Sequence, residues 1–165
     1  MHSTTRTAGT ATTAGCLVLL GLLLALPAAP TENRNGVDFS TWLEGASGML
    51  EATQRFDANP KPILVYFYTD WCGYCRQFER DLLASEEVQS YLRDEVLAVR
   101  INPEKGGGDA QVSRRYGVRG FPALFVHSAE SKVVSRVDRM EVVDGRPRLL
   151  SPSQFIEVLD RAGSR

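Results

Sequence analysis

The sequence predicts an α/β fold in which a mixed β-sheet lies between layers of helices. Runs of β-branched and aromatic residues alternate with stretches of helical periodicity through most of the chain. Such alternation implies strands joined by helical crossovers, which makes those strands parallel. The last two strand-like runs of the sheet are separated only by a short turn, which indicates an antiparallel pair. Together the two patterns give a mixed sheet.

Length and composition fit one globular domain with an appendage. The chain has 165 residues, of which 43% are apolar and 24% charged, and these values are ordinary for a soluble domain. The formal net charge of −1 offers no clustered basic surface, so we expect no nucleic-acid partner. We divide the chain into an N-terminal segment (1–30), a polar linker (31–37) and a folded domain (38–165).

The N-terminal segment is typical of a secretory signal or a membrane anchor. Residues 7–30 carry no charge and follow Arg6, and residues 16–26 are the most apolar part. The small residues Ala28 and Ala29 then offer a place for signal-peptidase cleavage. The uncharged run is also long enough to span a bilayer if it is not cleaved. Both interpretations place the folded domain outside the cytoplasm, in a periplasm or a similar space.

The first elements of the domain are a helix and a strand. Apolar residues recur with one-sided helical spacing from Phe39 to Phe56, with Asp38 or Ser40 as the cap. We interpret the aromatic residues of this stretch as core contacts. The prolines in residues 59–62 end the helix. Residues 63–68 are continuously apolar or aromatic, which predicts a central strand that is covered on both faces.

The middle of the domain continues the alternation. Helix-forming sequence runs over residues 76–83 and 86–92, and an apolar strand follows at 96–101. Residues 102–108 contain a proline and three glycines, which predict a loop. Asp109 is placed to cap a short helix that runs to residue 116.

The C-terminal part supplies the antiparallel pair and a closing helix. Strands are predicted at 123–127 and 133–137, with a turn between them. Residues 141–150 contain Asp144-Gly145, which is typical of an extra hairpin or an irregular insertion. Ser151-Pro152-Ser153-Gln154 has the chemistry of a helix start, and the helix that follows is amphipathic.

Cys72 and Cys75 carry the chemistry of this chain. They stand where the central strand passes into a helix, and the unpaired N–H groups and dipole of a helix start favour a thiolate. In motifs of this kind the thiol pKa falls by about one to five units. Cys72 would therefore attack a substrate disulfide, and Cys75 would resolve the mixed disulfide. The third cysteine, Cys16, is interpreted as a small apolar residue of the N-terminal segment.

Two other interpretations of the cysteine pair remain open. Structural zinc requires about four ligands, and the sequence offers no second cysteine pair and only His2 and His127 as histidines. A purely structural disulfide would close a very short loop and stabilise little. We therefore expect no metal and no other cofactor. His127 ends a predicted strand and is interpreted as a strand residue, with a proton carrier as the alternative.

Two segments resemble the thioredoxin superfamily. Residues 68–75, with the sequence Tyr-Thr-Asp-Trp-Cys-Gly-Tyr-Cys, resemble its active-site segment, and residues 116–124 resemble the stretch that leads into its cis-proline strand. The similarity covers residues 61–132. It implies a thioredoxin-like fold and a cis peptide bond before Pro122. It also implies that Phe121, next to this bond, pairs through its backbone with an extended substrate, and that Trp71, Gly73 and Tyr74 shape the substrate-binding surface.

Three departures limit what the resemblance implies. Tyr74 stands where thioredoxins usually have proline, so their reduction potential does not transfer. Tyr66 stands where they have a buried acid that assists the resolving cysteine, and here Asp70, Glu79 or water must assist, or the assistance is absent. The loop with three glycines, residues 106–108, is longer than the usual connection.

The expected function is thiol–disulfide exchange with protein substrates outside the cytoplasm. The Trp-Cys-Gly-x-Cys arrangement and the nearby Phe78-Glu79 resemble exported reducing domains, so we favour a reductase. Such a reductase needs electrons from a membrane protein, because cytosolic reductants are not assured outside. The alternative is a binding module that holds a client protein or Cu(I), a metal that prefers soft thiolate ligands.

Overall fold

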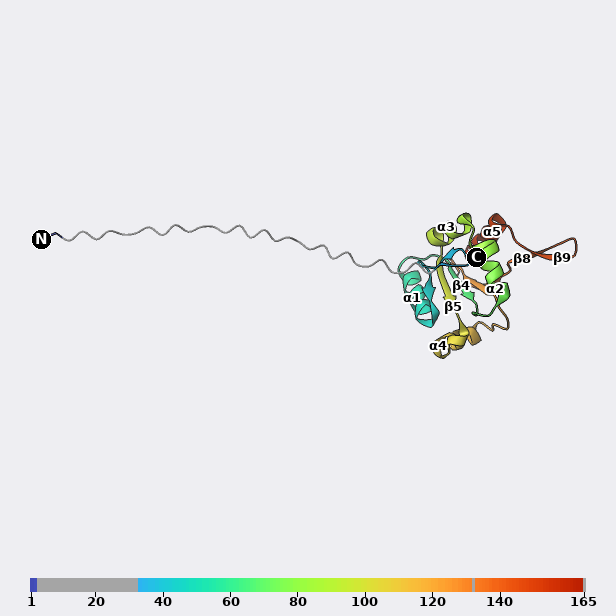
Figure 1. Cartoon of the computed structure of the whole chain (residues 1–165), viewed down its shortest axis with the longest axis horizontal. Coiled ribbons are helices and arrows are strands. Elements are labelled where there is room, and N and C mark those ends of the chain that lie inside the picture. The colour runs from blue at the N-terminus through green and yellow to red at the C-terminus, as the bar shows by residue number, and fades with distance from the viewer. Residues whose placement is uncertain (3–32, 132, 165) are drawn as a thin grey trace.

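The structure, a computed structural model, describes residues 1–2, 33–131 and 133–164, and from residue 33 these form helices around a central sheet (Figure 1). Most of the predicted signal or anchor, residues 1–30, lies outside the described residues. Within the described parts of the chain, no helix is both long and apolar enough to cross a bilayer.

The central sheet has five strands in the order β3-β5-β4-β6-β7 and is mixed, as predicted. The middle strand β4 (Ile63–Phe67) lies parallel to β5 (Leu97–Ile101) and antiparallel to β6 (Ala123–His127). The short strand β3 (Leu43–Glu44) pairs with β5, and β7 (Val134–Val137) completes the other edge.

Side chains of β4 alternate between two apolar layers, one on each face of the sheet. Leu64 and Tyr66 face the layer formed with α2 (Gly73–Phe78), the π-helical turn η1 (Glu79–Leu83), α3 (Glu86–Glu95) and α5 (Pro152–Gly163). Ile63, Val65 and Phe67 face the layer formed with α1 (Gly45–Ala58) and α4 (Gly107–Arg115). All five residues of β4 are buried, which confirms the prediction of a central strand covered on both faces.

The first helix starts later than predicted. We expected it from Phe39, but α1 begins at Gly45, whose φ of +64° is not helical. Phe39 and Trp42 are buried in the layer with α2, α3 and α5, whereas α1 covers the opposite face of the sheet. A single straight helix cannot pack against both faces of the sheet. The chain therefore passes from one face to the other at β3, before α1 begins. The prediction that the two aromatic residues are core contacts is confirmed.

A short hairpin precedes this crossing. Strands β1 (Asn33–Arg34) and β2 (Val37–Asp38) pair around Asn35 and Gly36, which have φ values of 52° and 85°. These residues fall within the segment predicted as a linker over 31–37. The side chains of Arg34 and Asn35 contact the domain, as described below.

The glycine-rich segment is more ordered than predicted. A short 3₁₀ helix, η2 (Pro103–Lys105), forms within the predicted loop, and α4 already starts at Gly107. Asp109 does not cap α4 as expected. Its carboxylate accepts a hydrogen bond of 2.7 Å from the backbone N–H of Ala46 and so caps the start of α1.

The C-terminal elements agree closely with those predicted from the sequence. Strands β8 (Met140–Val143) and β9 (Arg146–Leu149) form the predicted extra hairpin, and Asp144 and Gly145 at its turn both have positive φ. This hairpin extends away from the body of the domain (Figure 1). Ser151 and Gln154 form a complete capping box at the start of α5.

Candidate active site

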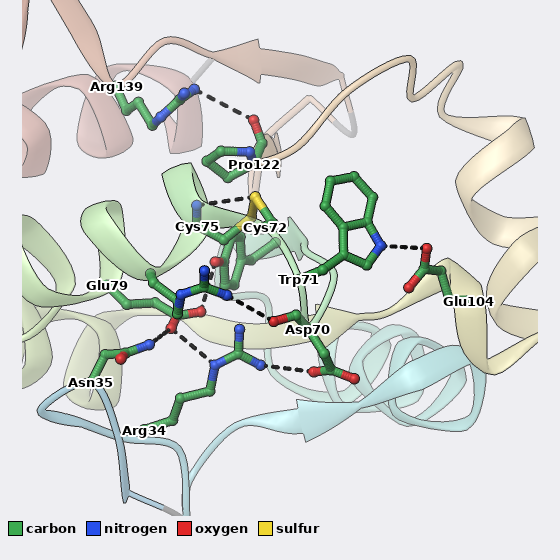
Figure 2. Close-up of a disulfide and its surroundings, with 12 residues drawn as sticks. Arg34, Asn35, Asp70, Trp71, Cys72, Cys75, Glu79, Glu104, Pro122 and Arg139 are labelled. Atoms are coloured by element: carbon green, nitrogen blue, oxygen red, sulfur yellow. Dashed lines mark hydrogen bonds and ion pairs between the residues drawn. A yellow bond between two sulfur atoms is a disulfide. The ribbon is translucent and has the colours of Figure 1, made fainter.

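Cys72 and Cys75 lie at the start of α2 and form a disulfide with a Cα–Cα distance of 5.2 Å (Figure 2). Cys72 is the N-cap residue of the helix, and its Sγ accepts a hydrogen bond of 3.0 Å from the backbone N–H of Cys75. The sulfur therefore occupies the position of an N-cap acceptor, where helix N–H groups and the dipole favour negative charge. Cys75 is fully buried, and Cys72 keeps a small exposed area.

Large aromatic side chains are exposed around the pair. Trp71 is 65% exposed and Tyr74 is 72% exposed, while Gly73 begins α2 without a side chain. The indole N–H of Trp71 donates to Glu104 at 2.6 Å, and its ring packs edge-to-face with the Phe121 ring, with 6.4 Å between the ring centroids. Exposed aromatic residues held in place are typical of a recognition surface.

The cis-proline segment lies on the other side of the sulfurs. The peptide bond between Phe121 and Pro122 is cis, as the resemblance implied. Figure 2 places Pro122 next to the cysteine pair, with Arg139 beyond it. The Arg139 guanidinium donates a hydrogen bond of 3.4 Å to the carbonyl oxygen of Pro122. The structure thus brings together all seven residues predicted for the site: Trp71, Cys72, Gly73, Tyr74, Cys75, Phe121 and Pro122.

A buried carboxylate lies one helical turn after Cys75. The side chain of Glu79 is only 1% exposed, and its backbone N–H donates to the carbonyl of Cys75. The hydroxyl of Tyr66 donates to one carboxylate oxygen at 2.8 Å. Arg34 Nε donates to the other oxygen at 3.0 Å, and the side-chain amide of Asn35 donates to the same oxygen. A buried charge requires this kind of pairing.

Arg34 joins two acids of the site. Its Nη1 contacts the Asp70 carboxylate at 3.1 Å, and its guanidinium lies over the Tyr68 ring at 4.8 Å. Asp70 accepts a second hydrogen bond, from the side-chain amide of Asn102. Its side chain remains 73% exposed, so Asp70 lies at the surface while Glu79 lies inside the domain.

The environment of Tyr66 keeps its hydroxyl protonated. Burial, followed by the charge of Glu79 and the hydrogen bond to it, raises the pKa of Tyr66 far above its usual value. Tyr66 therefore serves as a hydrogen-bond donor to Glu79 at every physiological pH.

Four residues of the site were not found by reasoning from the sequence: Arg34, Asn35, Glu104 and Arg139. Asn35-Gly36 is a common hairpin turn pair, and that signal could have revealed the β1–β2 hairpin. The contacts between this hairpin and Glu79 join residues more than 40 positions apart in the sequence, so no local sequence pattern predicts them. Glu79, between the buried Phe78 and Leu82, is itself a signal, because an acid among core residues calls for a partner.

His127 lies away from the site. It pairs with Ile63 at the beginning of β4, whereas the cysteines follow the end of that strand. Its ring nitrogen shares a hydrogen bond with the Tyr116 hydroxyl, and burial lowers the pKa of the imidazole. The described residues contain no cluster of three or more His, Cys, Asp or Glu side chains that could hold a metal ion.

Comparisons with known proteins agree with this geometry. The model of a family described as a thioredoxin-like domain matches residues 49–139. The chain is 32% identical over 96 residues to the thioredoxin-like protein slr0233 of Synechocystis, a match that covers 58% of this chain and 82% of that protein. It is 30% identical over 112 residues to the thiol:disulfide interchange protein DsbD of Ralstonia nicotianae, and here the match covers 68% of this chain but only 18% of DsbD.

Solved structures show the same fold. A thioredoxin from Thermus thermophilus superposes with a TM-score of 0.53 at 21% identity, and the match covers 73% of this chain and 86% of that one. The oxidised C-terminal domain of DsbD from Neisseria meningitidis gives a TM-score of 0.52 at 21% identity, with 73% and 98% covered.

Proposed function

Because the chain belongs to the thioredoxin-like family of thiol–disulfide oxidoreductases, we propose that it exchanges disulfides with protein substrates outside the cytoplasm, with Cys72 and Cys75 as its redox pair. The observation that carries the proposal is the position of the two cysteines at the start of α2, within bonding distance of each other. The family's chemistry requires this arrangement.

The reaction starts from the reduced pair. The helix start favours the thiolate of Cys72, which attacks one sulfur of a substrate disulfide and forms a mixed disulfide. The other substrate sulfur leaves as a thiolate and takes up a proton. The Cys75 thiolate then attacks Cys72 Sγ, which releases the second substrate thiol. Two electrons have passed to the substrate, and the pair is left as the disulfide seen in the structure.

Glu79 is the group that we assign to accept the proton of Cys75. The thiol must lose this proton before it attacks, and Glu79 lies one turn away on the buried side of the helix. Tyr66, at the position of the family's acid, instead donates to Glu79. Asp70, the second acid near the pair, is largely exposed and is paired with Arg34. The buried acid is therefore supplied by the helix and not by the strand.

The substrate surface consists of the groups around the sulfurs. Exposed Trp71 and Tyr74 provide apolar contact area, and Gly73 leaves space for the approaching chain. The backbone of Phe121, next to Pro122, is available for pairing with an extended substrate segment.

Location and direction complete the proposal. The N-terminal pattern of a signal or anchor over residues 1–30 supports export of the domain. In an exported space the oxidised pair requires a membrane protein as electron donor, because cytosolic reductants are not assured there. Tyr74 carries no positive charge between the cysteines, which supports a reducing rather than a strongly oxidising pair.

The reduction potential of the Cys72–Cys75 pair tests the direction. The protein is equilibrated in glutathione buffers of graded ratio, and the fraction of free thiols is measured by alkylation and mass spectrometry. A value near about −270 mV, the thioredoxin range, supports a reductase, whereas a value near about −120 mV identifies an oxidant and contradicts the proposed direction.

A further inference from the structure

A groove opens beside the redox pair, between α2 and the β8–β9 hairpin. Its volume is about 690 Å³, and its lining includes Tyr74 and Phe78 from the helix and Arg139, Met140, Pro147 and Leu149 from the hairpin and its base. We call it the hairpin groove. Its size is within the range of ligand-binding clefts, and its walls are mainly apolar with a few charged groups.

The hairpin that forms one wall lies outside the part of the chain that the family model matches. The match to the family model ends at Arg139, and the hairpin begins at Met140. A two-stranded hairpin alone is marginally stable, but this one is fixed at its base. The N–H of Leu150 donates to the carbonyl of Arg139 at 2.9 Å, and Glu141 accepts from Gln154 in α5. Its outer part exposes the apolar side chain of Val142.

Two residues of the lining, Tyr74 and Arg139, connect the groove to the site of the reaction. Tyr74 stands between the two cysteines and also lines the groove. Arg139 lines the groove as well, and it donates a hydrogen bond to Pro122, next to the sulfurs. A polypeptide bonded to Cys72 through its own cysteine would therefore run into this groove on one side.

Arg139 makes the groove favourable for a negatively charged group. This guanidinium is half-buried, and burial lowers its pKa. The other hairpin arginine in the lining, Arg148, is paired with Glu141 at 2.7 Å. Within residues 33–131 and 133–164, Arg139 forms no salt bridge. Asp81 is the acid of the lining and lies on the opposite wall, in η1.

We propose that the hairpin groove binds an extended, apolar segment of the partner protein next to its reactive cysteine, and that a carboxylate of this segment pairs with Arg139. The inference rests on the proposed function, because the partner's cysteine must react at Cys72. A partly desolvated charge pair of this kind adds both affinity and discrimination.

Peptides with an activated cysteine test the inference. Each decapeptide carries a central cysteine joined to thionitrobenzoate, flanked by valine and leucine and by either glutamate or glutamine. Cys72 of the reduced protein attacks the peptide sulfur and releases coloured thionitrobenzoate. Cys75 then displaces the peptide thiol and leaves the protein oxidised, so the electrons balance. The second-order rate of thionitrobenzoate release is compared between the two peptides.

We expect the wild-type protein to react about fivefold or more faster with the glutamate peptide than with the glutamine peptide, as one charge-assisted contact allows. Arg139→Gln, which removes the charge and keeps an amide donor, should abolish this ratio, and Arg139→Lys should retain part of it. Arg136→Gln, which removes an exposed cation of β7, is the matched control and should retain it fully.

Three results would overturn the inference: equal wild-type rates for both peptides, an unchanged ratio in Arg139→Gln, or an equal loss in Arg136→Gln. If Arg139→Gln does not fold, the salt dependence of the wild-type ratio decides, because a charge contact open to solvent must weaken at high ionic strength. Failure of the proposed function looks different, since the wild-type protein would then release thionitrobenzoate from neither peptide.

Discussion

Replacement of Arg34 by glutamine tests whether the β1–β2 hairpin compensates the buried acid behind the redox pair. Arg34 donates to Glu79 at 3.0 Å and to Asp70 at 3.1 Å, and its own side chain keeps 21% exposure. Glu79 is almost fully buried. The substitution therefore leaves a buried carboxylate without its cation, while Tyr66 and Asn35 remain as donors.

The size of the effect follows from the burial of each pair. Two unit charges about 4 Å apart attract by about 4 kcal/mol at the effective dielectric constant near a protein surface. Part of this is offset because Arg34 no longer gives up hydration. The pair with exposed Asp70 adds at most about 1 kcal/mol. We expect the free energy of unfolding to fall by about 2–4 kcal/mol, which lowers Tm by about 10 °C for a domain of this size.

Thermal and urea denaturation of four proteins measures this effect in a double-mutant cycle: wild type, Arg34→Gln, Glu79→Gln and the double variant. Once Glu79 is neutral, loss of Arg34 should cost at least about 1 kcal/mol less than in the wild type, because only the pair with Asp70 is then lost. Arg55→Gln, which removes an exposed helical pair with Glu51, is the control and should cost about 0.5 kcal/mol. The reasoning is refuted if Arg34→Gln costs no more than this control, or costs the same in both Glu79 backgrounds.

Three further predictions concern the proton acceptor, the last helix and the remote histidine. Glu79→Gln should slow the attack of Cys75 on a preformed mixed disulfide by about 100-fold, and a wild-type rate in rapid-quench measurements would remove Glu79 from the mechanism. Ser151→Ala breaks the capping box of α5 and should cost about 1 kcal/mol in urea denaturation, whereas an unchanged midpoint would mean that the cap contributes nothing. Because burial lowers the pKa of His127, the unfolded chain binds a proton that the folded protein does not once the pH falls below about 6.5. The stability of the wild type relative to His127→Gln should therefore decline from pH 7.5 to pH 5 in denaturation series, and a constant difference would contradict this.

The sequence predicted the elements whose signals are local. The central strand β4 is a continuous run of apolar and aromatic residues in the sequence. The start of α5 combines a capping serine, a proline and a glutamine within four residues. The cysteine pair could be assigned to a helix start for the same reason. In each case the deciding interactions lie within a few positions of one another.

The errors arose where distant residues decide the structure. The periodicity from Phe39 to Phe56 fits a helix, but Phe39 and Trp42 pack on the opposite face of the sheet from α1. Asp109 could cap its own helix, yet it caps α1, which starts more than 60 positions earlier. The contacts of Arg34 and Asn35 with Glu79 depend likewise on how β1–β2 docks on the domain. Local patterns do not contain such information.

Trapping of the mixed disulfide tests the central claim, that Cys72 attacks and Cys75 resolves, most directly. Reduced Cys75→Ser and Cys72→Ser proteins are mixed with a disulfide-containing protein, and covalent adducts are identified by mass spectrometry. Cys75→Ser should accumulate an adduct through Cys72, and Cys72→Ser should form little or none, because the fully buried Cys75 is not accessible. An adduct on Cys75 in the Cys72→Ser protein, or none in the Cys75→Ser protein, would contradict the assignment.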